Sequence, residues 1–283
     1  MDFRKTIELF LMDKTPNGRW RCTLSGWPGV AFKIPRDRIK DSESRQELSM
    51  PGVYFLFGKD EVMDRPLIYI GEAENTIVRL KQNLKAKDYW NEAIVFISAD
   101  SIDSNLNKAH IKYLENSFYS IAKDCNRYSV ENSKVPNKPL VTESDCEKLD
   151  EFIYYVKMMV NVLGHKVFEP YSEKLSEGEA DEMFHVSVGN EKASGTPTSD
   201  GFLLLKGSRI HNESADSLAS GIRKKVESSK ENRQIVDGVL QEDVLFSSSS
   251  AAAAFSVGYS ISGPQSWKTL SGKTLKDFET ETA

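Results

Sequence analysis

Residues 51–71, PGVYFLFGKDEVMDRPLIYIG, decide the fold of this chain. Two apolar runs rich in β-branched and aromatic residues lie on either side of a short polar segment, KDEVMDR, which is typical of two strands joined by a turn. A helical pattern follows directly, because Asn75 suits an N-cap and Ile77, Leu80 and Leu84 recur on one face. The stretch therefore predicts two paired strands followed by a helix that packs on them.

Strand and helix patterns also occur before and after this stretch. Further strands are predicted at 6–12, 19–27, 30–34 and 92–98. Helices are predicted at 106–123 and from a capping box at Ser144–Glu147 to Gly164, with a proline-containing loop at 128–141 between them. Short strands interleaved with helices predict an α+β fold with a small, mainly antiparallel sheet flanked by helices.

The composition changes after residue 170 and divides the chain. Residues 171–198 are acidic and rich in small residues, which indicates an interdomain connection that one strand, 184–188, could interrupt. A new apolar run follows at 202–210, then a polar helix at 214–232 and an alanine helix with Gly258 as its C-cap. We expect a β-rich N-terminal arm at 1–48, a main domain at 49–170, the acidic linker at 171–198 and a small α+β domain at 199–283.

Composition narrows the class of protein. No apolar run approaches the ~18 residues of a membrane span, and 28% of the residues are charged. The three cysteines are widely spaced, which supports neither a disulfide framework nor a structural zinc site, so we expect a reduced cytoplasmic location. The net charge is −5, and only the first fifty residues carry more basic than acidic groups, which argues modestly against tight duplex binding.

Five polar residues around the deciding stretch suit the hydrolysis of a phosphodiester, namely Tyr54, Tyr69, Arg79, Glu115 and Asn132. A tyrosine hydroxyl can relay a proton, and the planar arginine fork matches phosphate oxygens. A glutamate can hold a Mg²⁺ ion that keeps most of its waters, and an amide can orient a water or a tyrosine. Glu115 falls between Ile111 and Phe118 on a second apolar edge of its helix, which suits a sheltered ligand.

The order and spacing of these residues resemble the GIY-YIG nuclease family. Gly52-Val53-Tyr54 and Tyr69-Ile70-Gly71 are similar to the two motifs that name the family. The resemblance implies a Mg²⁺-dependent endonuclease, with Mn²⁺ as a substitute, acting on nucleic acid and most readily on DNA. It assigns catalytic roles to the two tyrosines, Arg79, Glu115 and Asn132, with Glu115 as the metal ligand. The arm and the C-terminal segments resemble a bacterial branch in which a small domain of undefined function follows the nuclease.

One position departs from the family pattern. Many relatives have a histidine four residues after the arginine, as a partner in proton transfer, whereas this chain has Asn83. An asparagine cannot take up a proton at neutral pH. Either tyrosine could carry that role alone, His110 could replace the histidine, or activity could be weak; we favour the first. Arg79, Asn83 and His110 are the candidate substrate-binding residues.

Two other functions stay open at this stage. Asn83 and the acidic balance also suit a nucleic-acid-binding module without useful turnover. Alternatively, the chain could be an interaction protein that acts through its C-terminal domain. The sequence leaves open the choice between DNA and RNA, the specificity and the oligomeric state, and it predicts no membrane partner.

Overall fold

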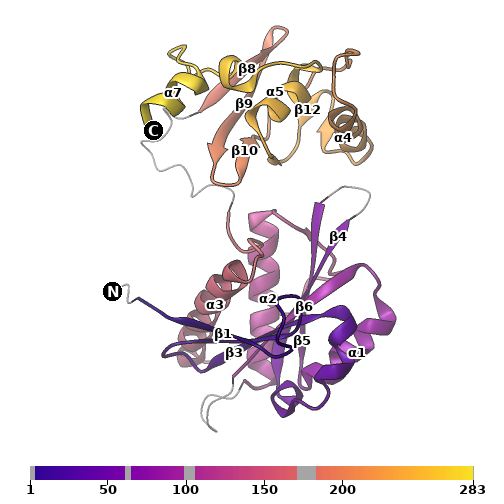
Figure 1. Cartoon of the computed structure of the whole chain (residues 1–283), viewed down its shortest axis with the longest axis vertical. Coiled ribbons are helices and arrows are strands. Elements are labelled where there is room, and N and C mark those ends of the chain that lie inside the picture. The colour runs from indigo at the N-terminus through magenta and orange to yellow at the C-terminus, as the bar shows by residue number, and fades with distance from the viewer. Residues whose placement is uncertain (1–3, 61–64, 99–105, 171–182, 283) are drawn as a thin grey trace. The chain divides into compact units, whose positions relative to one another are not determined.

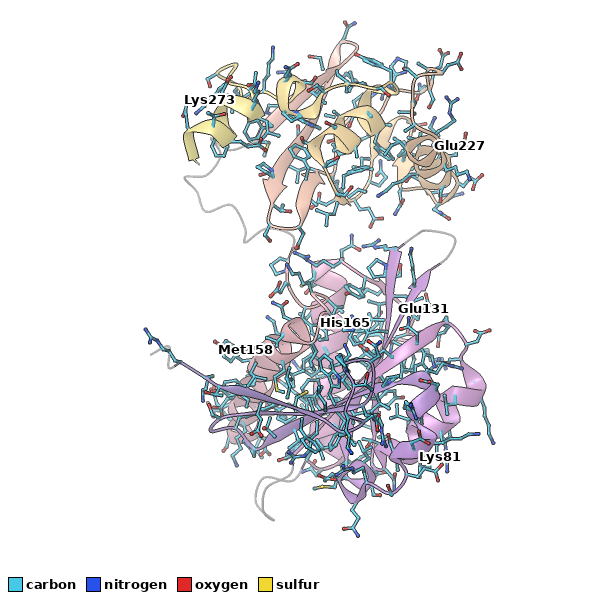
Figure 2. All side chains as sticks on the ribbon, in the orientation of Figure 1. Lys81, Glu131, Met158, His165, Glu227 and Lys273 are labelled. Carbon is cyan, nitrogen blue, oxygen red and sulfur yellow. The ribbon has the colours of Figure 1, made fainter. Side chains whose placement is uncertain are left out.

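The computed structural model describes residues 4–60, 65–98, 106–170 and 183–282. The chain divides into two compact units, one up to Pro170 and one from Tyr171, and each has its own sheet and its own hydrophobic core (Figure 1). Figure 2 shows the side chains of the described residues in each unit. The α+β class expected from the sequence is confirmed. None of the helices in the described ranges combines the length and apolar character needed to cross a bilayer.

A seven-stranded sheet forms the centre of the first unit. Its strands lie in the order β1 (Ile7–Leu11), β2 (Trp20–Leu24), β3 (Gly29–Pro35), β6 (Trp90–Ser98), β4 (Gly52–Asp60), β5 (Arg65–Ala73) and β7 (Ser129–Val130). Every pair is antiparallel except β5 and β7. Because β3 pairs with β6 along its whole length, the N-terminal arm supplies three adjacent strands of the sheet rather than a separate layer.

The register of β4 against β5 places the two tyrosines. Tyr54 lies opposite Gly71, and Leu56 lies opposite Tyr69. Directly opposed residues point to the same face of a sheet, and residues two apart along a strand do so as well. Tyr54 and Tyr69 therefore share one face, while Ile70 and Glu72 point to the other.

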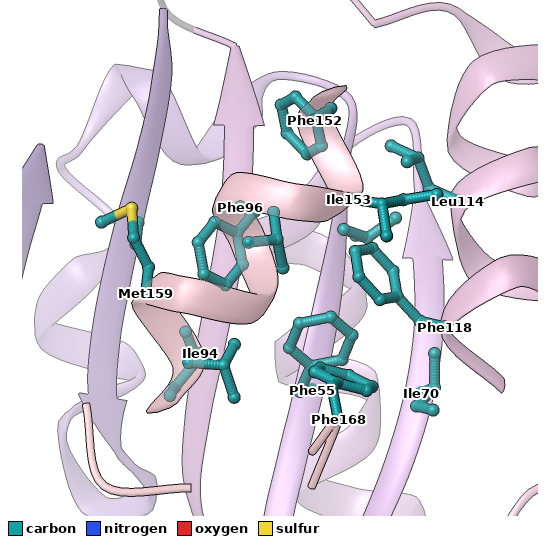
Figure 3. Packing of buried hydrophobic residues seen from close by; sticks show 14 of the residues in the cluster. Phe55, Ile70, Ile94, Phe96, Leu114, Phe118, Phe152, Ile153, Met159 and Phe168 are labelled. Carbon is teal, nitrogen blue, oxygen red and sulfur yellow. The ribbon is translucent and has the colours of Figure 1, made fainter. Parts of the chain in front are cut away.

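Helices cover both faces of this sheet. The face of Tyr54 carries α1 (Thr76–Ala86), whose Ile77 and Leu80 pack among the strand residues. The opposite face carries α2 (Lys108–Cys125) and α3 (Glu143–Val162). Figure 3 shows the core on this second face, where side chains of α2 and α3 meet those of the strands. Three short 3-10 turns, at Arg36–Arg38, Lys40–Ser42 and Gln46–Ser49, connect β3 to β4.

Several predicted element ends are confirmed and some are wrong. Asn75 caps α1 by accepting a hydrogen bond from the Val78 backbone. The predicted capping box at Ser144–Glu147 is wrong, because Thr142 is the N-cap of α3 and accepts a hydrogen bond from the Asp145 backbone. The predicted loop at 128–141 contains the short strand β7, whose pairing with β5 spans only two residues and leaves little sequence signal.

The second unit contains a four-stranded antiparallel sheet in the order β13 (Val244–Phe246), β10 (Gly201–Leu204), β9 (Glu191–Thr198) and β8 (Phe184–Val188). The remaining elements are β11 (Ile235–Val236), β12 (Val239–Leu240), α4 (Ser220–Glu231), α5 (Ser249–Val257), α6 (Gly263–Ser266) and α7 (Leu275–Thr282). The expected cap residue Gly258 ends α5 in the left-handed conformation.

The acidic linker predicted at 171–198 is too long. Residues 184–198 form β8 and most of a hairpin with β9, and Phe184, Val186 and Ala193 are buried in the second core. Alternating small and apolar residues provide one buried face, which the small residues and the acidic run just before it conceal in the sequence. The part of the predicted linker at 171–182 lies outside the described residues.

Gly71 allows the close approach of Tyr54 across the β4–β5 pair, because a Cβ atom at this position would overlap the tyrosine ring and hydroxyl. We expect Gly71→Ala to destabilise the first unit by about 1–3 kcal/mol through overpacking. The measurement is urea unfolding, monitored by the hydrogen exchange of peptides from β4 and β5. Gly221→Ala is the control, since it lies in the second unit and a Cβ there meets nothing within 4 Å. Equal stability of Gly71→Ala and wild type would contradict the described packing.

Candidate active site

The hydroxyl of Tyr54 is the meeting point of two side chains from α1. Arg79 Nε donates to the Tyr54 oxygen at 3.3 Å, and Asn83 Nδ2 donates to the same oxygen at 3.1 Å. The two donors lie four residues apart and therefore on one face of the helix. Tyr54 is 0% exposed and Asn83 is 3% exposed, so this contact is sealed from solvent. Asn83, predicted to bind substrate, instead supports Tyr54.

Burial governs the ionisation of Tyr54. Loss of hydration raises the pKa of its hydroxyl well above the ordinary value, and the nearby Tyr69 adds to this rise. The hydrogen bonds and charge from Asn83 and Arg79 act in the opposite direction but do not cancel the effect of burial. Tyr54 is therefore a neutral phenol at neutral pH.

Tyr69 lies beside Tyr54 but is more accessible. The two ring centres are 6.2 Å apart, and Tyr69 is only half-buried. Arg79 interacts with the hydroxyls of both tyrosines, and these contacts raise the pKa of the guanidinium further above its ordinary range. Arg79 also donates to Gln82 Oε1 at 3.1 Å. The guanidinium is thus held in place over the two tyrosines while the residue stays exposed to solvent.

Glu115 approaches this group from the other side of the sheet. It lies on α2, half-buried beside the core residues Ile111 and Phe118 as its helical spacing predicted. Burial raises the pKa of the Glu115 carboxyl to about 7, and the neighbouring Glu72 raises it further, whereas Arg79 and a hydrogen bond from the Glu72 backbone lower it. Glu115 is therefore within electrostatic reach of the arginine on the opposite face.

Glu72 and Lys108 are members of this cluster that the sequence reasoning missed. Lys108 Nζ lies 3.2 Å from Glu72 Oε1 and 3.2 Å from Glu74 Oε2. The Glu72 side chain is only 15% exposed, so its charge acts strongly on Glu115. A detectable signal existed: Glu72 follows Gly71 directly, and strand alternation points it to the face that α2 covers.

Asn132 holds the edge of β5. Its Oδ1 accepts a hydrogen bond from Ile70 N at 3.0 Å, and its Nδ2 donates to Ile70 O at 2.7 Å. The amide thus pairs with the strand as another backbone would. These contacts fit a residue that positions the second tyrosine motif, rather than one that touches reacting atoms.

His110 does not join the tyrosines and the arginine. Its backbone and ring bond to the N-cap residue Asn107 at the start of α2, and its Nε2 lies 3.6 Å from Asp145 Oδ1 on α3. Five residues separate His110 from Glu115, which is about 140° around the helix at 100° per residue. The structure therefore gives His110 a capping role and does not place it where the missing family histidine would act.

The chemistry of the donors suits a hard divalent cation. Burial and then the charge of Glu72 raise the pKa of the Glu115 carboxyl, and a bound cation would act against both effects. No cluster of three or more metal-ligating side chains exists within the described ranges. Mg²⁺ fits such a sparse site, because it usually binds through one or two carboxylates and retains several waters.

Comparison with known proteins gives a match only within the second unit. A family model described as a domain of unknown function (DUF4357) matches residues 184–279. Searches of curated proteins and of solved structures found no match to the chain. No nuclease family model matches the first unit, and its resemblance to the GIY-YIG family stays a prediction.

The free energy of unfolding measured without metal should depend on pH because of Glu115. A carboxyl whose pKa is higher in the folded state costs stability once it ionises, so this cost is absent below about pH 4.5 and complete above about pH 7. We expect Glu115→Gln to be more stable than wild type at pH 8 by roughly 1–2 kcal/mol, allowing for solvent screening. Urea unfolding in EDTA at pH 8 and pH 4.5 measures this, and the gain should disappear at the lower pH. Asp124→Asn, an exposed position on α2, is the control. A gain that is equal at both pH values would contradict the assigned cause.

Proposed function

We propose that the first unit is a Mg²⁺-dependent endonuclease that hydrolyses phosphodiester bonds of nucleic acid, most readily DNA. The observation that carries this proposal is the position of Arg79. Its guanidinium interacts with the hydroxyls of Tyr54 and Tyr69 on one face of the sheet, and its charge lowers the pKa of Glu115, which lies on the other face. An arginine fork between proton-handling hydroxyls and a carboxylate is the arrangement that phosphodiester hydrolysis needs. The GIY-YIG resemblance of the same residues also supports it.

The accessible tyrosine is the better candidate for the proton-transfer step. Tyr54 is fully buried and its oxygen already accepts two hydrogen bonds. Tyr69 is half-buried and interacts with the same guanidinium. We therefore assign the removal of the proton from the attacking water to Tyr69, and we assign to Tyr54 the positioning of Arg79.

The reaction then proceeds as follows. Tyr69 acts in its phenolate form: the water oxygen bonds to phosphorus while a water proton passes to the phenolate oxygen of Tyr69, and the bond between phosphorus and the leaving ester oxygen breaks. The leaving alkoxide takes a proton from solvent, and Tyr69 returns its proton to solvent. Arg79 binds the non-bridging phosphate oxygens, where negative charge increases in the transition state. A Mg²⁺ ion held by Glu115 would supply further positive charge to those oxygens, and Mn²⁺ could substitute for it.

A second function has specific support. The raised pKa of Tyr54 and the amide at position 83 are features of a site that binds a phosphodiester without turning it over. In that case Arg79 would still contact phosphate. The two functions differ in a single observable, which is whether the purified protein cuts.

We expect the protein to nick plasmid DNA with Mg²⁺ and to stop in EDTA. Glu115→Ala should lower the rate at least ~100-fold, because the cation loses its carboxylate ligand. Asp124→Ala, which removes an exposed carboxylate from the same helix, should keep the wild-type rate. Agarose-gel conversion of supercoiled to nicked plasmid provides the measurement. The hydrolase proposal fails if wild type and Glu115→Ala behave alike on both DNA and RNA.

The two tyrosines should respond differently to loss of the hydroxyl. Tyr69→Phe should reduce kcat by about 10²–10⁴-fold, the usual contribution of a general base. Tyr54→Phe keeps the ring but removes the anchor of Arg79, so we expect a smaller loss in kcat together with a raised KM. Single-turnover cleavage of a labelled duplex measures both. The opposite order of effects would assign proton transfer to Tyr54.

A further inference from the structure

Lys87 places a second cation beside the candidate site. It is the C-cap residue of α1, and its backbone N–H donates to Asn83 O. Its Nζ lies 4.1 Å from the centre of the Tyr69 ring and 5.7 Å from that of Tyr89. A cation over a tyrosine face is held by the negative charge density of the ring. The ammonium group is therefore fixed next to the tyrosine that we assign to proton transfer.

Lys87 continues the row of donors on α1. Arg79, Asn83 and Lys87 are spaced four residues apart, which places them along one face of the helix. The eight residues between Arg79 and Lys87 correspond to about 12 Å along the helix axis. That distance is comparable to the separation of phosphates a few nucleotides apart on one strand, at roughly 3.4 Å of rise per nucleotide.

The ammonium of Lys87 also lacks a carboxylate partner in the part of the chain that the structure describes. Two nearby lysines, by contrast, are paired with carboxylates: Lys81 Nζ lies 3.0 Å from Glu43 Oε1, and Lys108 bridges two glutamates. A half-buried ammonium that touches only aromatic faces keeps its three N–H donors for another acceptor. Phosphate oxygens are acceptors of the required charge.

We propose that Lys87 binds a backbone phosphate of the same nucleic-acid strand whose scissile phosphate contacts Arg79. The inference rests on the proposed function and extends it by defining how the substrate is recognised. Two cations on one helix face bind a strand through its charge and spacing, without reading the bases. This part of the affinity is therefore independent of sequence and depends on salt.

Salt dependence separates a phosphate contact from a purely structural role. Each neutralised phosphate contributes about 0.9 to the slope of log K against log salt for duplex DNA, and about 0.7 for a single strand. If Lys87 only steadied the Tyr69 ring, its removal would change stability or kcat and leave the slope alone. Arginine keeps both the contact with the ring and the affinity for phosphate, so it should rescue the slope.

The experiment measures binding of a fluorescein-labelled 20-nucleotide duplex, and of its single strand, by anisotropy in EDTA over a range of KCl concentrations. Lys87→Met should weaken binding several-fold and reduce the slope by about 0.9 on the duplex or about 0.7 on the single strand. Lys87→Arg should restore the wild-type slope. Lys85→Met is the matched control, because Lys85 is an exposed lysine of the same helix.

The outcomes distinguish this inference from the proposed function. If wild type binds and cuts DNA but Lys87→Met has the wild-type slope, the inference fails and the endonuclease stands. If wild type binds without cutting and Lys87→Met shows the expected reduction in the salt slope, the phosphate contact stands and the hydrolytic function fails. Equal reductions in Lys87→Met and Lys85→Met would also overturn the inference, since they would indicate a diffuse charge effect.

Discussion

The register of β4 against β5 is the constraint on which the candidate site depends. Tyr54 lies opposite Gly71, and the absence of a side chain at Gly71 lets the tyrosine ring cross the neighbouring strand. A slip by one residue would place the two tyrosines on opposite faces of the sheet, so that only one of them could face the donors of α1. The first motif thus supplies the tyrosine ring, and the second supplies the glycine that makes room for it.

The edge of β5 explains how residues from both faces come together. The short strand β7 pairs only with Leu67 and Ile68, and Asn132 then bonds to Ile70 in place of a further strand residue. Further along β5, the backbone N–H of Glu72 donates a hydrogen bond to the carboxylate of Glu115 on α2. The amide of Asn132 therefore bonds to the edge of β5 just beyond the end of β7.

The sequence predicted the elements and caps that local residue patterns control. It missed the roles of residues that depend on partners distant in the chain. Strand alternation and the Asn75 cap identified the elements that bear Tyr54, Tyr69 and Arg79. Glu72 was missed because its importance comes from Glu115, which is distant in the chain. His110 was misassigned because a ring that caps its own helix looks the same in sequence as a ring that faces a site. Most of residues 184–198 was misread because an acidic run at 173–182 and many small residues suggested a linker and concealed a buried strand face.

Asn83 gives the strongest argument about how this site differs from the family it resembles. A histidine at that position would change its charge near neutral pH, and its contact with Tyr54 would change with it. An amide donates one hydrogen bond at every pH, so Tyr54 keeps its acceptor role and its neutral state under all ordinary conditions. This constancy removes Tyr54 from proton exchange and leaves it as the anchor of Arg79. The substitution is thereby compatible with the proposed catalysis only if the half-buried partner, Tyr69, handles the proton, and the proposed mechanism follows from that restriction.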